Sequence, residues 1–173
     1  MNWSTFDSVL FTVDKLIFIA YFVLLILATL VERKVSSFII TLIVLTVANG
    51  AMTSISPMLY QYASQPGLAT KFVWYASFAL IDMFAIFLLF KFHKLLKQNV
   101  GYIAKVVGLM FLTFATLQTT RFIDRFVFDS ELLQQAYQYA IPVLNVVLIP
   151  IIVITWLSEL KRNQVYRKLS SAI

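Results

Sequence analysis

The chain has 173 residues, of which 61% are hydrophobic and 13% are charged, and its formal net charge is +6. Soluble domains are about 45–50% apolar and about 25% charged. With a mean hydropathy of +0.86, this composition excludes a water-soluble domain and predicts an integral membrane protein. There are no cysteines and one histidine, His93. This excludes disulfides, thiolate metal sites and a bis-histidine haem, so we expect no cofactor.

Five segments are long and apolar enough to cross a bilayer, which takes about 20 residues of helix. They predict an all-α integral membrane protein, a bundle of five transmembrane helices in a single domain covering residues 1–173. The predicted spans are residues 9–31, 35–60, 72–90, 106–128 and 139–157. The first span is too long for a signal peptide and has no basic segment before it. The charged cluster Glu32-Arg33-Lys34 that follows it is typical of a stop-transfer flank, so we expect it to be retained.

The distribution of lysine and arginine predicts the orientation of the bundle. Ten of the fourteen basic residues fall on one side of a five-span arrangement: Arg33, Lys34, Lys91, Lys94, Lys97, Lys105, Lys161, Arg162, Arg167 and Lys168. The positive-inside rule makes this side cytoplasmic. We therefore expect the N-terminus outside, the C-terminus in the cytoplasm, and a location in the inner (plasma) membrane. The opposite side carries the tyrosines and tryptophans expected at a membrane interface: Trp3, Tyr60, Tyr62, Trp74, Tyr75, Tyr137 and Tyr139.

The third span carries a carboxyl group, Asp82, near its middle. At 1.5 Å of helix rise per residue, Asp82 lies about 16 Å from Lys71, close to the centre of a bilayer. A charged group at that depth is costly and marks a candidate functional site. Three interpretations remain open: a structural contact within the bundle, a group that handles a ligand or ion, or a contact with a partner.

Each of the five spans places a strongly polar side chain in the half of the membrane that is predicted to face outside. These residues form a predicted polar layer: Asp14, Lys15, Asn49, Asp82, Gln118, Arg121, Arg125 and Asn145. We expect Arg121 to be the ion-pair partner of Asp82, with Lys15 as the second choice. Asp14 is expected to join the network through Arg121 or Arg125. The alternative is that these groups only hold helices together, at about 0.6 kcal/mol per contact.

The fifth span has two prolines, Pro142 and Pro150, on either side of Asn145. Proline removes a backbone donor and kinks a helix, and kinked helices often line membrane sites. We expect Pro142 to be tolerated near the helix start and Pro150 to mark a functional kink. The alternative is that both prolines only shape the packing, as is common in transmembrane helices.

Catalytic motifs of the GxSxG, P-loop, GxGxxG and HExxH types are missing, so we do not expect an enzyme. His93 is expected at the cytoplasmic interface and not as a catalytic base. The leading hypothesis is a channel-like or transport subunit, working as an oligomer or within a membrane complex, with the polar layer as its site. Protonation or ion-pair exchange at Asp82, coupled to movement of the Pro150 kink, would be its mechanism.

The alternative hypothesis is a non-catalytic interaction protein, such as a sensor, an immunity or defence component, or an assembly subunit. Its working surface would be a cytoplasmic basic face made of Lys91, Lys94, Lys97, Lys161 and Arg162. Such a face suits anionic lipid or an acidic protein. Nucleic acid is not an expected partner, because no basic-aromatic stretch lies outside the spans.

Overall fold

The computed structural model describes the backbone of residues 3–170 and the side chains of residues 12–162. It contains five helices: α1 (Trp3–Glu32), α2 (Ser37–Ala63), α3 (Leu68–Leu95), α4 (Tyr102–Phe126) and α5 (Gln134–Ser170). Each helix includes a stretch long and apolar enough to span a membrane, so the prediction of an all-helical protein with five helices of this kind is confirmed, as expected of a multi-pass membrane protein. The side chains of Trp3, Arg167 and Lys168, which entered the orientation argument, lie outside the described residues.

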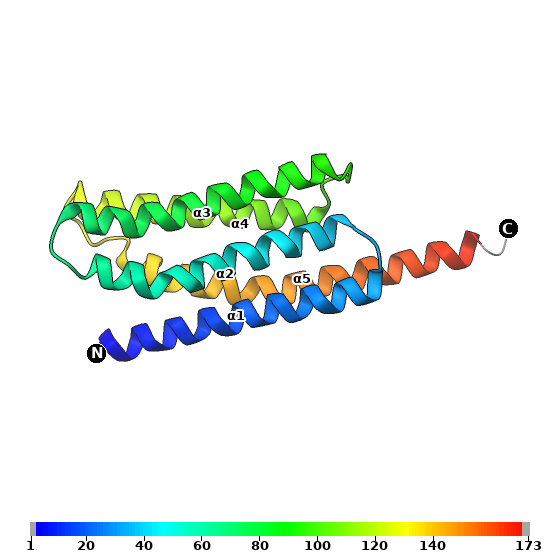
Figure 1. Cartoon of the computed structure of the whole chain (residues 1–173), viewed down its shortest axis with the longest axis horizontal. Coiled ribbons are helices and arrows are strands. Elements are labelled where there is room, and N and C mark those ends of the chain that lie inside the picture. Colours follow the sequence, from blue (N-terminus) through cyan, green and yellow to red (C-terminus); the bar gives the residue numbers. More distant parts are fainter. Residues whose placement is uncertain (1–2, 171–173) are drawn as a thin grey trace.

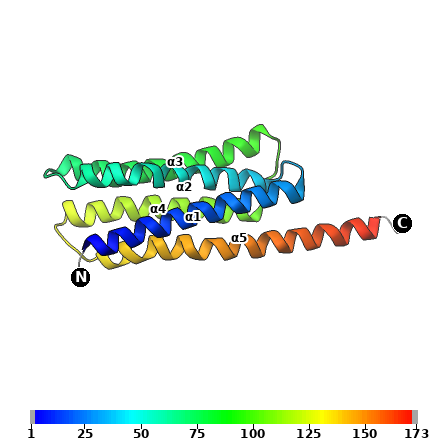
Figure 2. The same ribbon diagram turned by 60° about the horizontal axis from the view of Figure 1, so that its bottom comes forward.

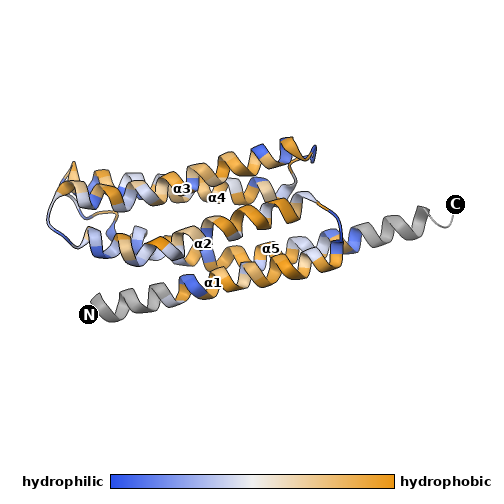
Figure 3. Ribbon diagram, in the orientation of Figure 1, coloured by the Kyte–Doolittle hydropathy of each residue, from blue (hydrophilic) through white to orange (hydrophobic). Residues whose placement is uncertain are grey.

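Consecutive helices pack side by side, and α5 packs against both α1 and α4 (Figures 1 and 2). The connections are short, which favours antiparallel neighbours. The start of α1 and the connections at residues 64–67 and 127–133 lie at one end, called here the amino end. The connections at residues 33–36 and 96–101 lie at the other, the carboxyl end, beyond which α5 extends. Figure 3 shows hydrophilic residues concentrated in the connections, with apolar residues along the helices.

α5 is longer than predicted and remains one unbroken helix through both of its prolines. Pro150 is exposed on the outer surface, and the functional kink expected at this residue stays a prediction. A proline gives up one backbone hydrogen bond, and a helix inside a bundle can continue across that loss. The sequence analysis also overlooked Pro57, which lies inside α2 near its end.

The packed core occupies the middle and the carboxyl half of the bundle. Its buried members come from all five helices and include Tyr21, Leu42, Leu45, Leu89, Ile103, Val107, Leu148 and Ile152. Large apolar side chains such as Leu80, Phe84, Leu109 and Ile154 are exposed on the outer surface. An apolar exterior is what a helix surface in contact with lipid tails requires.

His93 lies in the last turn of α3, at the carboxyl end of the bundle where the sequence placed it, but it is buried between helices, with 1% of its surface exposed. Its Nδ1 lies 2.7 Å from the carbonyl oxygen of Leu89, and its Nε2 lies 2.8 Å from Oγ of Ser37. The backbone N–H of Gly101 donates to the same Oγ at 2.9 Å. Ser37 therefore links α2, α3 and the α3–α4 connection. A Cβ atom at Gly101 would lie 2.8 Å from this Oγ. Any larger residue at position 101 would therefore clash with Ser37.

A second polar contact at the carboxyl end joins α5 to α1. Nε1 of Trp156 in α5 donates to Oε1 of Glu32 in α1 at 3.0 Å. The indole ring also stacks on Phe38 of α2, with the ring centroids 5.7 Å apart. Three helices thus meet at Trp156, and the carboxyl half of the bundle is held by both apolar packing and polar contacts.

We predict that Ser37→Ala lowers the free energy of unfolding by about 1–3 kcal/mol, because it leaves Nε2 of the buried imidazole and the Gly101 N–H without their partner. The matched control is Ser158→Ala. Ser158 is exposed and donates only to Ile154 of its own helix, so a change within about 0.5 kcal/mol is expected. Chemical denaturation of the purified protein in detergent measures both, and equal effects would contradict the prediction.

Candidate functional site

A cavity of about 480 Å³ lies in the half of the bundle nearer the amino end, and all five helices contribute to its wall. Pockets that hold small molecules are typically about 300–1,000 Å³. The strongly polar residues of the wall are Asp14, Asn49, Lys71, Asp82, Gln118, Arg121, Arg125, Gln134, Gln138 and Asn145. Rings and aliphatic side chains form much of the remainder, so the cavity combines apolar surface with a few convergent polar groups.

Seven of the eight residues of the predicted polar layer line this cavity. The exception is Lys15, whose side chain is exposed. Neighbouring residues on a helix point about 100° apart, so α1 can turn Asp14 toward the cavity and Lys15 away from it. Their positions along the spans place these residues at a similar depth, and the packing of the helices directs seven of them into the cavity.

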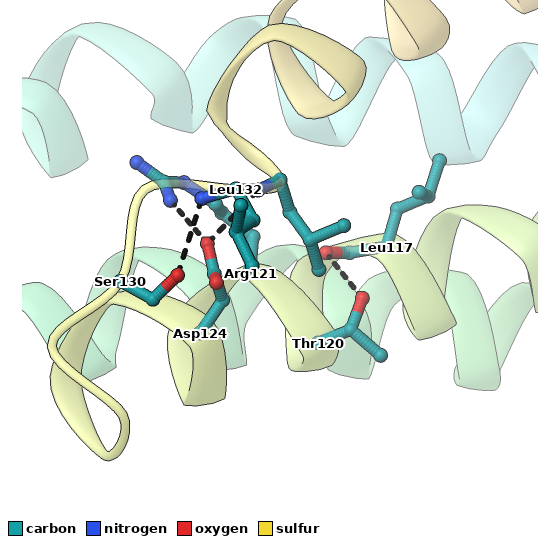
Figure 4. Close-up of polar contacts among 7 residues, drawn as sticks. Leu117, Thr120, Arg121, Asp124, Ser130 and Leu132 are labelled. Carbon is teal, nitrogen blue, oxygen red and sulfur yellow. Dashed lines mark hydrogen bonds and ion pairs between the residues drawn. The ribbon is translucent and has the colours of Figure 1, made fainter.

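The ion pair predicted between Arg121 and Asp82 is wrong. Nη1 of Arg121 lies 2.7 Å from Oδ2 of Asp124, and both side chains are buried. The same Oδ2 accepts the backbone N–H of Leu133 at 3.1 Å, and the N–H of Ser130 donates to the backbone carbonyl of Asp124 at 2.9 Å. Figure 4 shows the guanidinium of Arg121 pointing at the carboxylate of Asp124, while the hydroxyl of Ser130 accepts the backbone N–H of Leu132 at 3.3 Å. The i, i+3 spacing within α4 was the signal for this pair.

The other two basic side chains of the wall also have contacts. Nζ of Lys71 donates to the backbone carbonyls of Ala63 and Gln65, at the end of α2. Such a placement is favourable, because the carbonyl end of a helix carries partial negative charge. The guanidinium of Arg125 lies 5.4 Å from the ring centroid of Phe126. Neither arginine forms the expected ion pair with Asp14 among the described residues.

Asp82 stands apart from these groups. Only 1% of its surface is exposed, and neither carboxyl oxygen accepts a hydrogen bond from any residue that the structure describes. The predicted second partner, Lys15, therefore does not reach it either. Burying a carboxyl group without a partner is costly, and more so when the group is ionised. Asp82 is the α3 residue of the cavity wall farthest from the amino end, so this unpartnered group lies in the deeper part of the cavity.

An aromatic network runs along the wall between the amino end and Asp82. The rings of Trp74 and Phe78 meet edge to face with centroids 4.9 Å apart, and Tyr60 packs on Trp74 at 6.2 Å. Nε1 of Trp74 donates to the hydroxyl of Tyr137 at 3.4 Å, which in turn donates to Oε1 of Gln118 at 2.8 Å. The sequence placed Trp74 and Tyr137 in an interfacial belt, but their role in the wall depends on contacts between α3, α4 and α5.

The two asparagines of the wall have mainly structural contacts. Nδ2 of Asn49 donates to the carbonyl of Leu45 in its own helix at 3.1 Å. The backbone carbonyl of Asn145 accepts the hydroxyl of Tyr21 at 3.2 Å, which joins α5 to α1. Pro142 also lies in the wall. Because proline has no N–H, it leaves the carbonyl of Gln138 without its helical partner at the edge of the cavity.

Among residues 12–162, no three His, Asp or Glu side chains are grouped so that they could hold a metal ion. Comparisons of the chain with protein-family models, curated proteins and solved structures gave no match. The site is therefore defined by its own geometry: a cavity with an aromatic wall, three engaged basic groups and a buried, unpartnered carboxyl group.

We predict that replacing aspartate by asparagine changes the stability of the protein differently at its two buried aspartates, Asp82 and Asp124. Asp124→Asn leaves the guanidinium of Arg121 without a counter-charge and frees the backbone N–H of Leu133, so it should lower the free energy of unfolding. Asp82→Asn removes a buried carboxyl group that has no partner, so stability should be unchanged or slightly higher. Chemical denaturation in detergent compares the two variants. An equal loss of stability would mean that Asp82 is held by contacts of similar strength.

Proposed function

We propose that the protein is a small transport or channel-like subunit that admits a solute to the cavity. A single observation supports this most strongly: polar side chains from all five helices line one cavity, and its wall includes the buried Asp82. Polar groups used only to join helices would be expected to pair with one another. Here Asp82 accepts no hydrogen bond within the described part of the chain.

The contrast between Asp82 and Asp124 supports a working role for Asp82. The charge of Asp124 is tied to Arg121 and to the α4–α5 connection, so changing it would disturb the fold. Asp82 can gain or lose a proton, or pair with a bound group, without breaking an internal contact. We propose that this exchange drives the working cycle. The carboxyl half of the bundle is packed, so passage across the membrane would require a second arrangement of the helices.

α5 is the helix best placed to provide that second arrangement. Its main contacts are with α1 and α4, whereas α2 packs against α1, α3 and α4. α5 also carries Pro142 in the cavity wall. Movement of α5 about this point would change the cavity directly, which a hinge at the exposed Pro150 would not.

We further propose that the amino end faces outside and the carboxyl end the cytoplasm of an inner (plasma) membrane. All the described basic residues that predicted this orientation belong to the carboxyl end: Arg33, Lys34, Lys91, Lys94, Lys97, Lys105, Lys161 and Arg162. The cavity then opens on the outer side. A homo-oligomer or a larger membrane complex would complete any path through the bilayer.

An aqueous cavity can be tested by cysteine labelling, because the chain has no cysteines of its own. We predict that Phe78→Cys reacts with a membrane-impermeant thiol reagent, because position 78 lies in the cavity wall. Leu80→Cys, which is exposed on the outer surface of the same helix, should be protected by lipid. Asp82→Cys should react more slowly than Phe78→Cys but faster than Leu80→Cys. Mass spectrometry of protein in nanodiscs measures the rates.

Protection of positions 78 and 82 to the same degree as position 80 would show a dry bundle and contradict the proposal. Where both positions react, vesicles loaded with a pH-sensitive dye test the proposed role of Asp82. Asp82→Asn should then change the proton flux driven by an applied potential. An unchanged flux would exclude a mechanism that passes through this carboxyl group.

The second candidate function is binding of an acidic protein or anionic lipid at the carboxyl end. It is favoured by five exposed basic side chains that form no ion pair with any described residue: Lys91, Lys94, Lys97, Lys161 and Arg162. Such clusters attract anionic surfaces over about a Debye length. In this function the cavity residues would serve the fold alone.

For this second function we predict that reversing two charges, Lys94→Glu with Lys97→Glu, releases a protein that co-purifies with the wild-type chain. The matched control reverses the basic charge of Lys15, which is exposed in the half of the bundle nearer the amino end. Affinity purification from native membranes measures the partner. A complex that survives the double reversal would count against the basic face as its binding surface.

A further inference from the structure

We propose that the cavity binds an organic cation, with its ammonium group against Asp82 and its apolar body against the rings of α3 and α4. This inference rests on the proposed function, since it names the class of solute that the same cavity admits. The geometry points to it through three separate features: the balance of partnered and unpartnered charges, the composition of the wall around Asp82, and the arrangement of the wall along α3.

The charges of the wall leave negative groups without partners. All three basic side chains are engaged: Arg121 with Asp124, Lys71 with the end of α2, and Arg125 with the ring of Phe126. The two acidic side chains of the wall, Asp14 and Asp82, form no ion pair with any residue of the described part of the chain. A ligand with a positive charge would therefore meet a carboxyl group that is free to pair with it, whereas the basic groups of the wall already have partners.

The wall around Asp82 suits an organic cation better than a bare ion. Phe78 lies one turn from Asp82 on α3, and Phe111 and Phe114 of α4 line the same cavity. All three rings are buried. Aromatic faces attract ammonium groups and also provide apolar contact. A metal ion would need several oxygen ligands at once, and the described residues offer no such group here.

An anionic ligand fits less well. The buried guanidinium that could receive it is already neutralised by Asp124 at 2.7 Å. Asp82, in the deeper part of the cavity, would repel a negative group that entered to full depth. An anion could reach only the entrance groups, Lys71 and Arg125, and would leave the aromatic wall unused.

The arrangement of the wall along α3 also suits an elongated ligand with one charged end. Lys71, Trp74, Phe78 and Asp82 recur every three or four residues, so they share one face of the helix. Along this face the side chains change from basic at the amino end, through aromatic, to acidic in the middle of the bundle. With 1% of Asp82 exposed, the ammonium group reaches the carboxyl group only by displacing part of the wall.

Binding of 2-phenylethylammonium to the full-length protein in nanodiscs tests the inference, with the neutral 2-phenylethanol as a probe of similar shape. Isothermal titration calorimetry should show that the cation binds more tightly than the alcohol. Asp82→Asn should weaken binding of the cation by about 30-fold or more, as when one partner of a buried charge pair is removed. Phe78→Leu should weaken it about two- to fivefold, through loss of the cation–π contact.

Two further variants separate a local effect from a general one. Glu159→Gln removes one negative charge near the carboxyl end, away from the cavity wall, and should leave cation binding unchanged. Asp82→Glu keeps the charge and should keep the preference for the cation over the alcohol, which covers the case in which the asparagine variant does not fold. Equal effects of Glu159→Gln and Asp82→Asn would overturn the inference.

The inference and the proposed function fail in different ways. Reactive cysteines at positions 78 and 82, together with equal affinity for the cation and the alcohol, would overturn the inference and leave an aqueous cavity in place. Tighter binding of phenylacetate than of the cation would do the same and identify an anion site. Protected cysteines with no binding of any probe would overturn both.

Discussion

The ion pair between Arg121 and Asp124 determines both the shape of the cavity and the charge left inside it. Through the same carboxylate, Asp124 holds the backbone of Leu133, so the pair fixes the connection that leads into α5. The first turns of α5 then bring Tyr137, Gln138 and Pro142 into the wall. Because Arg121 is neutralised locally, its charge is not available to Asp82, which lies deeper in the bundle.

The two halves of the bundle satisfy their polar groups in different ways. At the carboxyl end, the Ser37–His93–Gly101 and Glu32–Trp156 contacts join different helices around a packed core. Toward the amino end, the polar groups surround open space, and Asp82 has no partner among the described residues. Inside a bilayer, water does not compensate for missing partners. A ligand or a proton would therefore stabilise the half of the bundle that contains the cavity more than the other half. The packed carboxyl half holds the helices that form the cavity wall.

Most of the fold could be predicted from the sequence, because the length and hydropathy of a span are properties of contiguous residues. The same is true of depth: a rise of 1.5 Å per residue placed Asp14, Asn49, Asp82 and Asn145 at a similar level. The pairing of charges could not be predicted in this way. Arg121 had carboxyl groups within plausible reach on its own helix and on others, and the rotation of each helix decided which one it meets. Lys15 shows the same limit, because it shares the depth of Asp14 but not its direction.

By itself, the sequence determined five membrane-spanning helices, a basic carboxyl end and a layer of polar residues in the other half. These follow from local composition, since each span must match the thickness of a bilayer. Only the tertiary structure decided that seven of those residues share one cavity, that His93 is buried, and that Asp82 is left without a partner. Each of these depends on how helices distant in sequence rotate and pack against one another, and the hydropathy of a single helix carries no information about that rotation.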